Sequence, residues 1–509
     1  MNLNYYDIIN ELFVYSPETP ILYTRPVFWI LFTLIMGFYS VLYKKNLIRN
    51  IFLLAVSLFL YYKTNGSFLV LLVFSCLFNY QSGIIIRKRR SEKGNKAWLV
   101  VAITINLIIL AYFKYAYFFT ESANEIFRTK YEVINWLVLW ENDLFGTSFN
   151  ATSILLPVGI SFYTFQAISY LIDVYRKRVR AVKNVFDFSF YLAFFPQLIA
   201  GPIVRASAFI PQLYQKYRLT KAEFGHSVFL ILKGLVKKIV FADFIAANFI
   251  DRIFSSPISY SGVENILAVY GYSLQIYADF SGYTDIAIGL ALLMGFKLPV
   301  NFNEPYKANS LTNFWRRWHI SLSLWLRDYL YIPLGGNRKG KFRTYINLLI
   351  TMVLGGLWHG ANLRFVIWGS IHGIGLVFDK LWKSITKNRF SHSRITKAVS
   401  IFITFNLVTF AWLFFRAESQ EVVNQFFYQV HHNLNLSILP DVIKGYSLPF
   451  LIMGLGFILI YTPFVIKERF RGWFIKSPIY IKLIIVVITV LILYQAASSE
   501  LQAFIYFKF

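Results

Sequence analysis

Long apolar stretches recur along the whole sequence and are separated by short polar or basic segments. Each is long enough to cross a bilayer, or most of one, as a helix. The stretches lie at about 26–43, 68–86, 97–119, 154–172, 227–249, 264–296, 345–361, 363–379, 396–415, 447–466 and 481–496. A membrane β-barrel would instead show short segments of alternating hydrophobicity. The pattern therefore predicts an all-α, polytopic integral membrane protein, a bundle of about 11 to 13 membrane helices with additional re-entrant or interfacial helices.

A short polar segment, KTNGS at 63–67, predicts a reversal of the chain between two apolar stretches. On its N-terminal side, the stretch 51–62 would form a helix of roughly 18 Å, which is shorter than the ~30 Å hydrocarbon core. We therefore expect a short hairpin here that thins the bilayer or lines a recess.

The middle of the chain, roughly 190–345, departs from this simple pattern. Proline and glycine interrupt one apolar stretch at 195–202, lysines interrupt another at 233–238, and Asp279 and Asp285 interrupt a third. At membrane depth such residues are tolerated only where protein or a water-filled cavity covers them. We therefore expect the bundle to surround a central funnel or tunnel.

Near the end of this middle part, the segment 312–331 predicts one helix in or near the membrane interface. Large apolar side chains recur at helical spacing along it, and charged side chains run beside them. The apolar stripe consists of Trp315, Trp318, Leu322, Trp325 and Tyr329, and its neighbours are Arg316, Arg317, Arg327 and Asp328.

The charge distribution sets the expected orientation of the chain. The net charge of +26 could indicate a nucleic-acid partner, but the basic residues cluster in short loops between the apolar stretches. Such loops face the cytoplasm in membrane proteins, and they account for the charge without nucleic acid. These loops are 44–49, 87–96, 176–183, 338–343, 380–397 and 467–471. The acidic segment 121–150 is expected outside, together with the N-terminus.

Two histidines are the strongest candidates for chemistry. His359 lies in the apolar segment GGLWHG, and His319 lies in FWRRWH. Imidazole is a workable base at neutral pH, and a base is what an alcohol needs to attack an ester or thioester. Trp315, Trp318 and Trp358 could donate ring N–H groups to the oxyanion and exclude water.

Other interpretations of these histidines stay open on the residues alone. His359 could make an interhelical hydrogen bond, and buried Asp, Lys and His side chains could line the path of a lipid or ion transporter. His372 is a weaker candidate, and the remaining four histidines look ordinary. A di-iron oxidase is excluded because the seven histidines contain no pair at i,i+3 or i,i+4, so no metal site is expected. The single cysteine, Cys76, is interpreted as a small core residue.

Several stretches of the chain resemble the membrane-bound O-acyltransferase (MBOAT) family, and most of all the bacterial branch that acts in alginate O-acetylation. Each stretch alone would be weak, but together they are specific. They are LPVGISFYTFQ at 156–166, FPQLIAGPI at 195–203, DFSGYTD at 279–285, NFNEPY at 301–306, FWRRWHISLS at 314–323, RDY at 327–329, PLGGNR at 333–338, WHG at 358–360 and FIYF at 504–507.

The resemblance implies a membrane O-acyltransferase with His359 as the active-site histidine and His319 as the second histidine of the bacterial branch. It implies that acetyl groups pass from a cytoplasmic thioester, acetyl-CoA, to an exported polysaccharide through an extracytoplasmic partner protein. D-alanyl transfer to teichoic acid is the alternative. No tightly bound cofactor is expected. Trp315, Arg316, Arg317, Trp318, Asp328 and Trp358 are the expected substrate-binding residues.

The resemblance also implies one domain over residues 1–509 in the bacterial cytoplasmic (inner) membrane. Within it we expect N-terminal membrane helices at 1–150, a catalytic core at 151–380 and further membrane helices at 381–509. The basic side chains of Arg316, Arg317 and nearby loops would attract the polyphosphate of acetyl-CoA.

Overall fold

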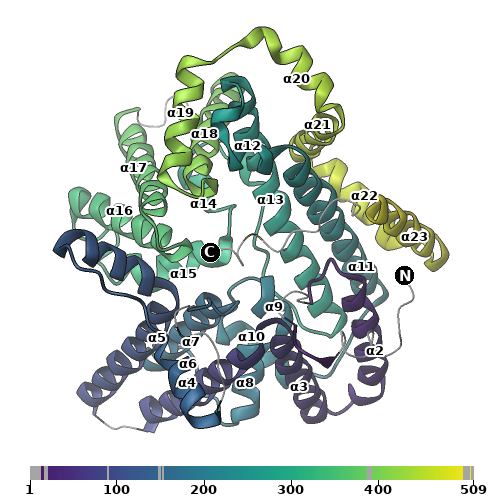
Figure 1. The fold of residues 1–509 in the computed structure, drawn as a ribbon. Coiled ribbons are helices and arrows are strands. Elements are labelled where there is room, and N and C mark those ends of the chain that lie inside the picture. The colour runs from purple at the N-terminus through teal and green to yellow at the C-terminus, as the bar shows by residue number, and fades with distance from the viewer. Residues whose placement is uncertain are drawn as a thin grey trace.

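A computed structural model describes residues 13–16, 21–88, 91–146, 151, 154–386, 393–496 and 505. All regular structure in this described part is helical, with no strand, and the helices surround a central region (Figure 1). Four described helices are long and apolar enough to cross a membrane, or five if a pair bent by 97° is one span. The all-α membrane fold is confirmed, while the count of 11 to 13 membrane helices stays a prediction.

The N-terminal part contains the first long helices. They are α2 (Pro26–Leu42), α3 (Asn46–Asn65), η1 (Gly66–Phe68), α4 (Leu69–Lys88), α5 (Glu92–Phe127) and α6 (Trp136–Phe145). The break at Gly66, which has a φ of +56°, lies in the predicted turn. The predicted short helix at 51–62 was wrong, because α3 begins earlier and has 20 residues. The polar residues at the start of α3 can be buried because the Arg49 side chain donates hydrogen bonds to the backbone carbonyls of Leu213 and Gln215.

The middle of the chain is irregular, as predicted. It is built from α7 (Ile160–Tyr175), α8 (Val185–Ala193), α9 (Phe195–Ala200), α10 (Ala206–Leu213), α11 (Lys221–Val236), η2 (Lys237–Asp243), η3 (Ala246–Ile250), α12 (Asp251–Ser255), η4 (Pro257–Ser259) and α13 (Gly262–Leu293). The elements η2 and η3 are π-helical. Two of the lysines that interrupt the apolar stretch, Lys233 and Lys237, pair with Asp285 at 3.1 and 2.8 Å. The pairing between α11, η2 and α13 explains how these charges are accommodated.

The segment that carries both candidate histidines follows. It contains η5 (Pro305–Lys307), α14 (Leu311–Trp315), α15 (Ile320–Leu326), η6 (Arg327–Tyr331), α16 (Gly340–His359) and α17 (Leu363–Thr386). The single helix predicted for 312–331 was wrong: the chain leaves the helix after Trp315 and starts again at Ile320. The stripe side chains are buried in the protein rather than placed at the interface.

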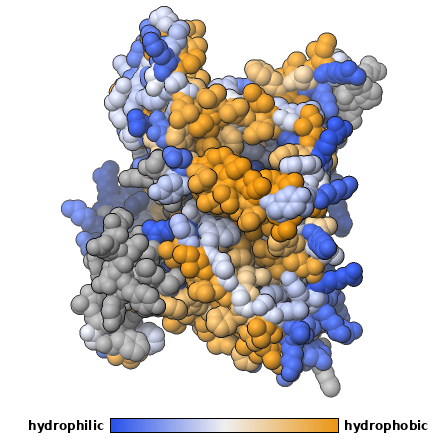
Figure 2. Space-filling view, turned by 90° about the vertical axis from the view of Figure 1, so that its right-hand side faces the viewer, coloured by the Kyte–Doolittle hydropathy of each residue, from blue (hydrophilic) through white to orange (hydrophobic). Residues whose placement is uncertain are grey.

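The C-terminal part adds the remaining helices, of which the first packs against α13 and α17. They are α18 (Arg394–Arg416), α19 (Gln420–His432), η7 (Leu436–Ile438), α20 (Leu439–Gly445), α21 (Ser447–Tyr461), α22 (Phe464–Lys476) and α23 (Ile479–Ala496). Figure 2 shows the face of the molecule that lies on the right in Figure 1. Apolar side chains cover the middle of this face, and hydrophilic side chains gather at its right-hand edge and upper left. An apolar belt between polar edges is the surface that a bilayer requires.

One cluster of buried apolar side chains extends from Ile21 to Ile505, so the N-terminal, central and C-terminal parts share a core. Cys76 is buried within α4, as expected for a core residue. Of the C-terminal FIYF motif only Ile505 lies in the described part, where its N–H donates to Asp279 Oδ2 at 2.9 Å.

Candidate functional site

His359 is the last residue of α16, directly before the turn into α17. Two glycines allow that turn to be tight. A Cβ at Gly356 would lie 2.1 Å from the carbonyl oxygen of Phe365, and a Cβ at Gly360 would lie 2.0 Å from the Phe365 ring. The glycines therefore let the start of α17 pack against the end of α16 and bury His359 between them.

The His359 ring lies in an aromatic enclosure and is 3% exposed. Its centroid is 4.9 Å from that of Trp358, 5.1 Å from that of Trp368 and 5.1 Å from that of Phe415, all edge to face. From α5, Lys114 Nζ donates to the carbonyl oxygens of His359, at 3.1 Å, and Trp358. These contacts hold the end of α16 in place and leave the imidazole in a buried, mainly aromatic environment.

His319 is fully buried just before α15, in the left-handed region at a φ of +41°. Asn301 stabilises this conformation. Its Oδ1 accepts from the N–H and hydroxyl of Ser321 at 3.1 and 2.9 Å and lies 3.3 Å from His319 Nδ1. The His319 ring packs edge-on against Phe280 at 4.7 Å. The unusual backbone at His319 is thus fixed by a residue outside the motif that contains it.

The two histidines meet at Trp358. Its ring is 6.1 Å from the His319 ring and 4.9 Å from the His359 ring, centroid to centroid. Beside them is a cavity of about 30 Å³, lined by Lys114, 156–162, Trp358 and His359. The structure therefore brings together the two histidines that the sequence singled out, and places His359 at a cavity.

The other two predicted tryptophans lie one layer further away. Trp315 contacts Trp368 and His372 at ring distances of 5.8 and 5.2 Å. Trp318 stacks on Phe314 and packs at a tilt against Trp412. Within the described residues, the ring N–H groups of Trp315 and Trp358 are buried without a hydrogen-bond acceptor. Trp358 is thus the indole donor that lies beside both imidazoles.

The predicted polar residues of this segment have different surroundings. Arg316 is exposed, whereas Arg317 donates hydrogen bonds to the Asn313 side chain and to the Asn303 carbonyl. Neither arginine is among the residues that line the cavity at His359.

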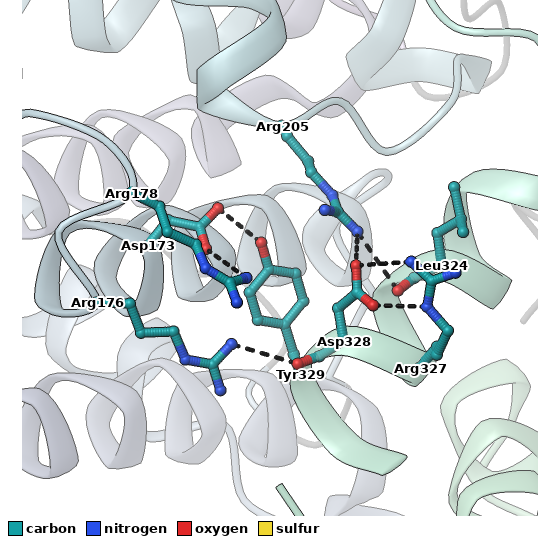
Figure 3. Close-up of polar contacts among 8 residues, drawn as sticks. All are labelled: Asp173, Arg176, Arg178, Arg205, Leu324, Arg327, Asp328 and Tyr329. Atoms are coloured by element: carbon teal, nitrogen blue, oxygen red, sulfur yellow. Dashed lines mark hydrogen bonds and ion pairs between the residues drawn. The ribbon is translucent and has the colours of Figure 1, made fainter. Parts of the chain in front are cut away.

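Asp328 forms the centre of a cluster of arginines (Figure 3). Arg327 Nε is 2.6 Å from Asp328 Oδ1, and Arg205 pairs with Oδ2. Arg176 donates to the Asp328 carbonyl at 3.3 Å, and the next residue, Tyr329, donates to Asp173 at 2.7 Å. Burial alone would raise the pKa of the Asp328 carboxyl, but hydrogen bonds from Arg327 and Arg205 hold it below its usual value. Asp328 is therefore a carboxylate that pairs with the guanidinium groups of Arg327 and Arg205 and holds them in place.

Lys114 and His372 also lie beside the site, although sequence reasoning did not select Lys114 and gave His372 less weight. Lys114 was a lone basic residue in the apolar stretch 97–119, which is a signal for function at membrane depth. His372 is 1% exposed, and its ring lies 4.7 Å from that of Trp368, which also contacts His359. Its spacing of four residues from Trp368 was the available signal. Within the described ranges, no three His, Cys, Asp or Glu side chains are arranged to hold a metal ion.

Comparisons with known proteins place this chain among acyltransferases. The family model of MBOAT, the membrane-bound O-acyltransferase family, matches residues 179–417 of the sequence. This range includes both histidines. A probable alginate O-acetylase of Pseudomonas aeruginosa is 43% identical over 380 residues, 74% of this chain and 68% of that protein. A peptidoglycan O-acetyltransferase of Helicobacter pylori is 37% identical over 79% of this chain and 78% of its own length. A teichoic acid D-alanyltransferase of Streptococcus thermophilus is 32% identical over 52% of this chain and 70% of its own.

Proposed function

This chain belongs to the membrane-bound O-acyltransferase family, and we propose that it moves acetyl groups from cytoplasmic acetyl-CoA across the membrane for O-acetylation of an exported polysaccharide. That it is an O-acyltransferase in a membrane follows from the family. Acetyl transfer is favoured over D-alanyl transfer because the two O-acetylases match more of this chain at higher identity. The proposed setting is the bacterial inner membrane, with an extracytoplasmic partner protein that completes the transfer.

The direction of transfer is inferred from α16. The basic segment 338–343, expected in the cytoplasm, contains the start of this helix, whose 20 residues lead roughly 30 Å to His359 at the other end. The backbone N–H of Thr312 in α14 donates to the carboxylate of Asp379 in α17. Asp379 directly precedes the basic segment 380–397, which is also expected in the cytoplasm. Arg316 and Arg317 thus belong to the cytoplasmic side, where they would attract the phosphates of acetyl-CoA.

The chemistry assigned to the site is a proton transfer coupled to acyl exchange. His359 takes the proton from the hydroxyl of the acceptor while that oxygen attacks the thioester carbonyl. The tetrahedral oxyanion accepts a hydrogen bond from the indole N–H of Trp358. As the carbon–sulfur bond breaks, the imidazolium returns the proton to the CoA thiolate, so the base is restored. His319 positions the acyl donor or relays the proton.

The observation that carries this proposal is that two buried imidazoles, those of His319 and His359, both contact the indole ring of Trp358 next to a cavity. The test is acetyl transfer by the purified protein in liposomes with labelled acetyl-CoA, followed by release of CoA thiol and by label in the acceptor. His359→Ala should lower turnover by about 10²–10⁴-fold at unchanged protein level. His432→Ala, which changes an exposed histidine on α19, should leave turnover as it is.

Three other outcomes would contradict all or part of the proposal. Flux of substrate through the liposome membrane without exchange of the acyl bond would indicate a lipid or ion transporter. Full acetylation of the polysaccharide in cells that carry His359→Ala would indicate a structural subunit. Transfer of D-alanine but not of acetyl would keep the enzyme class and change the acyl group.

A further inference from the structure

A second, larger cavity of about 510 Å³ lies beyond His359. It shares Lys114 and Leu156 with the small cavity at the histidine, and the turn residues 360–362 form part of its wall. The cavity is therefore at the end of α16 that lies away from the basic loop 338–343. A molecule that approaches His359 from the side opposite to acetyl-CoA would pass through it.

Four basic side chains line this cavity, and three of them have partners. Lys238 lies 2.6 Å from Asp243 and 2.5 Å from Asp279. Arg416 lies 2.6 Å from Asp251 and 3.5 Å from Glu418. Lys114 donates to two backbone carbonyls. These contacts engage all four acidic side chains that line the cavity.

Arg364 is the fourth basic side chain, and its situation differs. It is only 7% exposed, yet its Nε and Nη1 atoms have no hydrogen-bond acceptor in the described part of the chain. Its position is fixed: the backbone N–H donates to Asn362 Oδ1 at 3.1 Å, and the guanidinium lies 5.5 Å from the centroid of the Phe365 ring. A buried guanidinium with unused donors is unfavourable unless an acceptor binds it.

The chemistry of the missing acceptor follows from the guanidinium. Its planar fork matches two oxygens of one carboxylate or phosphate, and such charge-assisted pairs are the strongest hydrogen bonds available to it. Lys114, which has no carboxylate partner among the described residues, is a second basic side chain on the wall of the same cavity. In the described part of the chain, the four carboxylates that line this cavity pair with Lys238 or Arg416, so a ligand is the remaining source of such an oxyanion there.

We propose that Arg364 binds a carboxylate or phosphate carried by the acyl acceptor, and so holds the acceptor in the 510 Å³ cavity with its hydroxyl toward His359. This inference rests on the proposed function for the identity of the acceptor. The anion site itself depends only on the geometry of the cavity. Four residues separate Arg364 from His359 along a turn, so an anion at one end of the acceptor would orient the other end at the base.

The first experiment measures binding without activity. The purified full chain in detergent is heated in rising concentrations of sodium acetate, sodium phosphate or sodium chloride at matched ionic strength. Acetate or phosphate should raise the melting temperature of the wild type, and Arg364→Gln should need at least tenfold more of that anion for the same rise. A response to acetate alone assigns a carboxylate, and a response to phosphate alone assigns a phosphate.

The matched control is Arg252→Gln, which removes an exposed arginine one residue from Asp251 of the cavity wall. It should respond to the anion as the wild type does. Arg364→Lys, which keeps the charge but loses the fork, should respond more weakly than the wild type. Equal responses of wild type and Arg364→Gln, or an equal effect of chloride, would overturn the anion site.

A second experiment separates this inference from the proposed function. His359→Ala should keep the anion response of the wild type while losing acetyl transfer, because Arg364 is unchanged. In liposomes, the anion that stabilises the wild type should inhibit its transfer and have at least tenfold less effect on Arg364→Gln. If anion binding persists but does not inhibit transfer, Arg364 does not hold the acceptor. If the wild type transfers no acetyl, the proposed function fails and the melting experiment still decides the anion site.

Discussion

At the scale of single residues, the site depends on side chains that hold the histidines as much as on the histidines themselves. Asn301 is the clearest case. It is fully buried, and one oxygen accepts from both polar groups of Ser321 and lies within reach of His319. Its backbone carbonyl also accepts from the N–H of Ile320. One residue therefore starts α15 and fixes the imidazole that precedes it.

Replacing Asn301 tests this dependence. Asn301→Ala should lower the free energy of unfolding by about 1–3 kcal/mol, because it leaves buried donors at the start of α15 without an acceptor. It should also reduce acetyl transfer, since the left-handed conformation of His319 loses its support. The measurements are thermal unfolding in detergent and the liposome assay. Asn303→Ala, two residues along and exposed, is the control and should change neither. An unchanged melting temperature for Asn301→Ala would contradict the argument.

Part of the site could be predicted at this scale. His359, His319 and Trp358 stood out because imidazole and indole in apolar sequence are rare enough to point to function. Lys114 was visible as a lone lysine in an apolar stretch, but its contact with His359, 245 residues away, was not. Asn301 did not stand out, because its role depends on contacts with His319 and Ser321, 18 and 20 residues away. Arg364 was not distinguishable from other basic residues, since its lack of an acceptor is a property of the fold.

At the scale of elements, the pair α16 and α17 forms the most closely packed part of the site. Small residues bring their backbones together: a Cβ at Gly369 would lie 2.4 Å from the Met352 carbonyl oxygen, and one at Gly373 would lie 2.9 Å from the Leu349 side chain. This close approach positions the turn that carries His359. By contrast, the break between α14 and α15 was not predictable, because the apolar stripe continues through it and the break depends on Asn301.

The packing of this pair can be tested at Gly369. Gly369→Ala should destabilise the protein by about 1–3 kcal/mol, because the added methyl meets backbone that cannot move without separating the helices. Acetyl transfer should fall as His359 shifts. Gly454→Ala, in α21 with nothing within 4 Å of the new Cβ, should be neutral or stabilise slightly because alanine favours helix. Thermal unfolding of both variants measures the contrast, and equal melting temperatures would refute the close-packing argument.

At the scale of the whole molecule, charge and hydropathy predicted the fold class, which the structure confirms, and an orientation, which stays a prediction. The lengths of several helices depended on buried contacts. Basic loops and apolar stretches alternate in a way that needs no tertiary information. The irregular middle was predictable as irregular, from its prolines, glycines and charges. Its π-helical form and its ion pairs were not, because Lys238 reaches Asp279 on another helix.

The orientation of the chain in the membrane can be tested by labelling introduced cysteines, because the sequence contains a single cysteine that is easily replaced. In a Cys76→Ala background, Lys341→Cys places a thiol at the start of α16, and Glu418→Cys places one just after α18, on a side chain that is 79% exposed. A thiol reagent that does not cross membranes should label position 418 from the outside of right-side-out vesicles and position 341 only in inverted vesicles. This follows because the loop 338–343 is basic and because α16 is long enough to span the bilayer. Labelling of both positions from one side would place His359 and acetyl-CoA differently relative to the membrane, and transfer across the bilayer would lose its support.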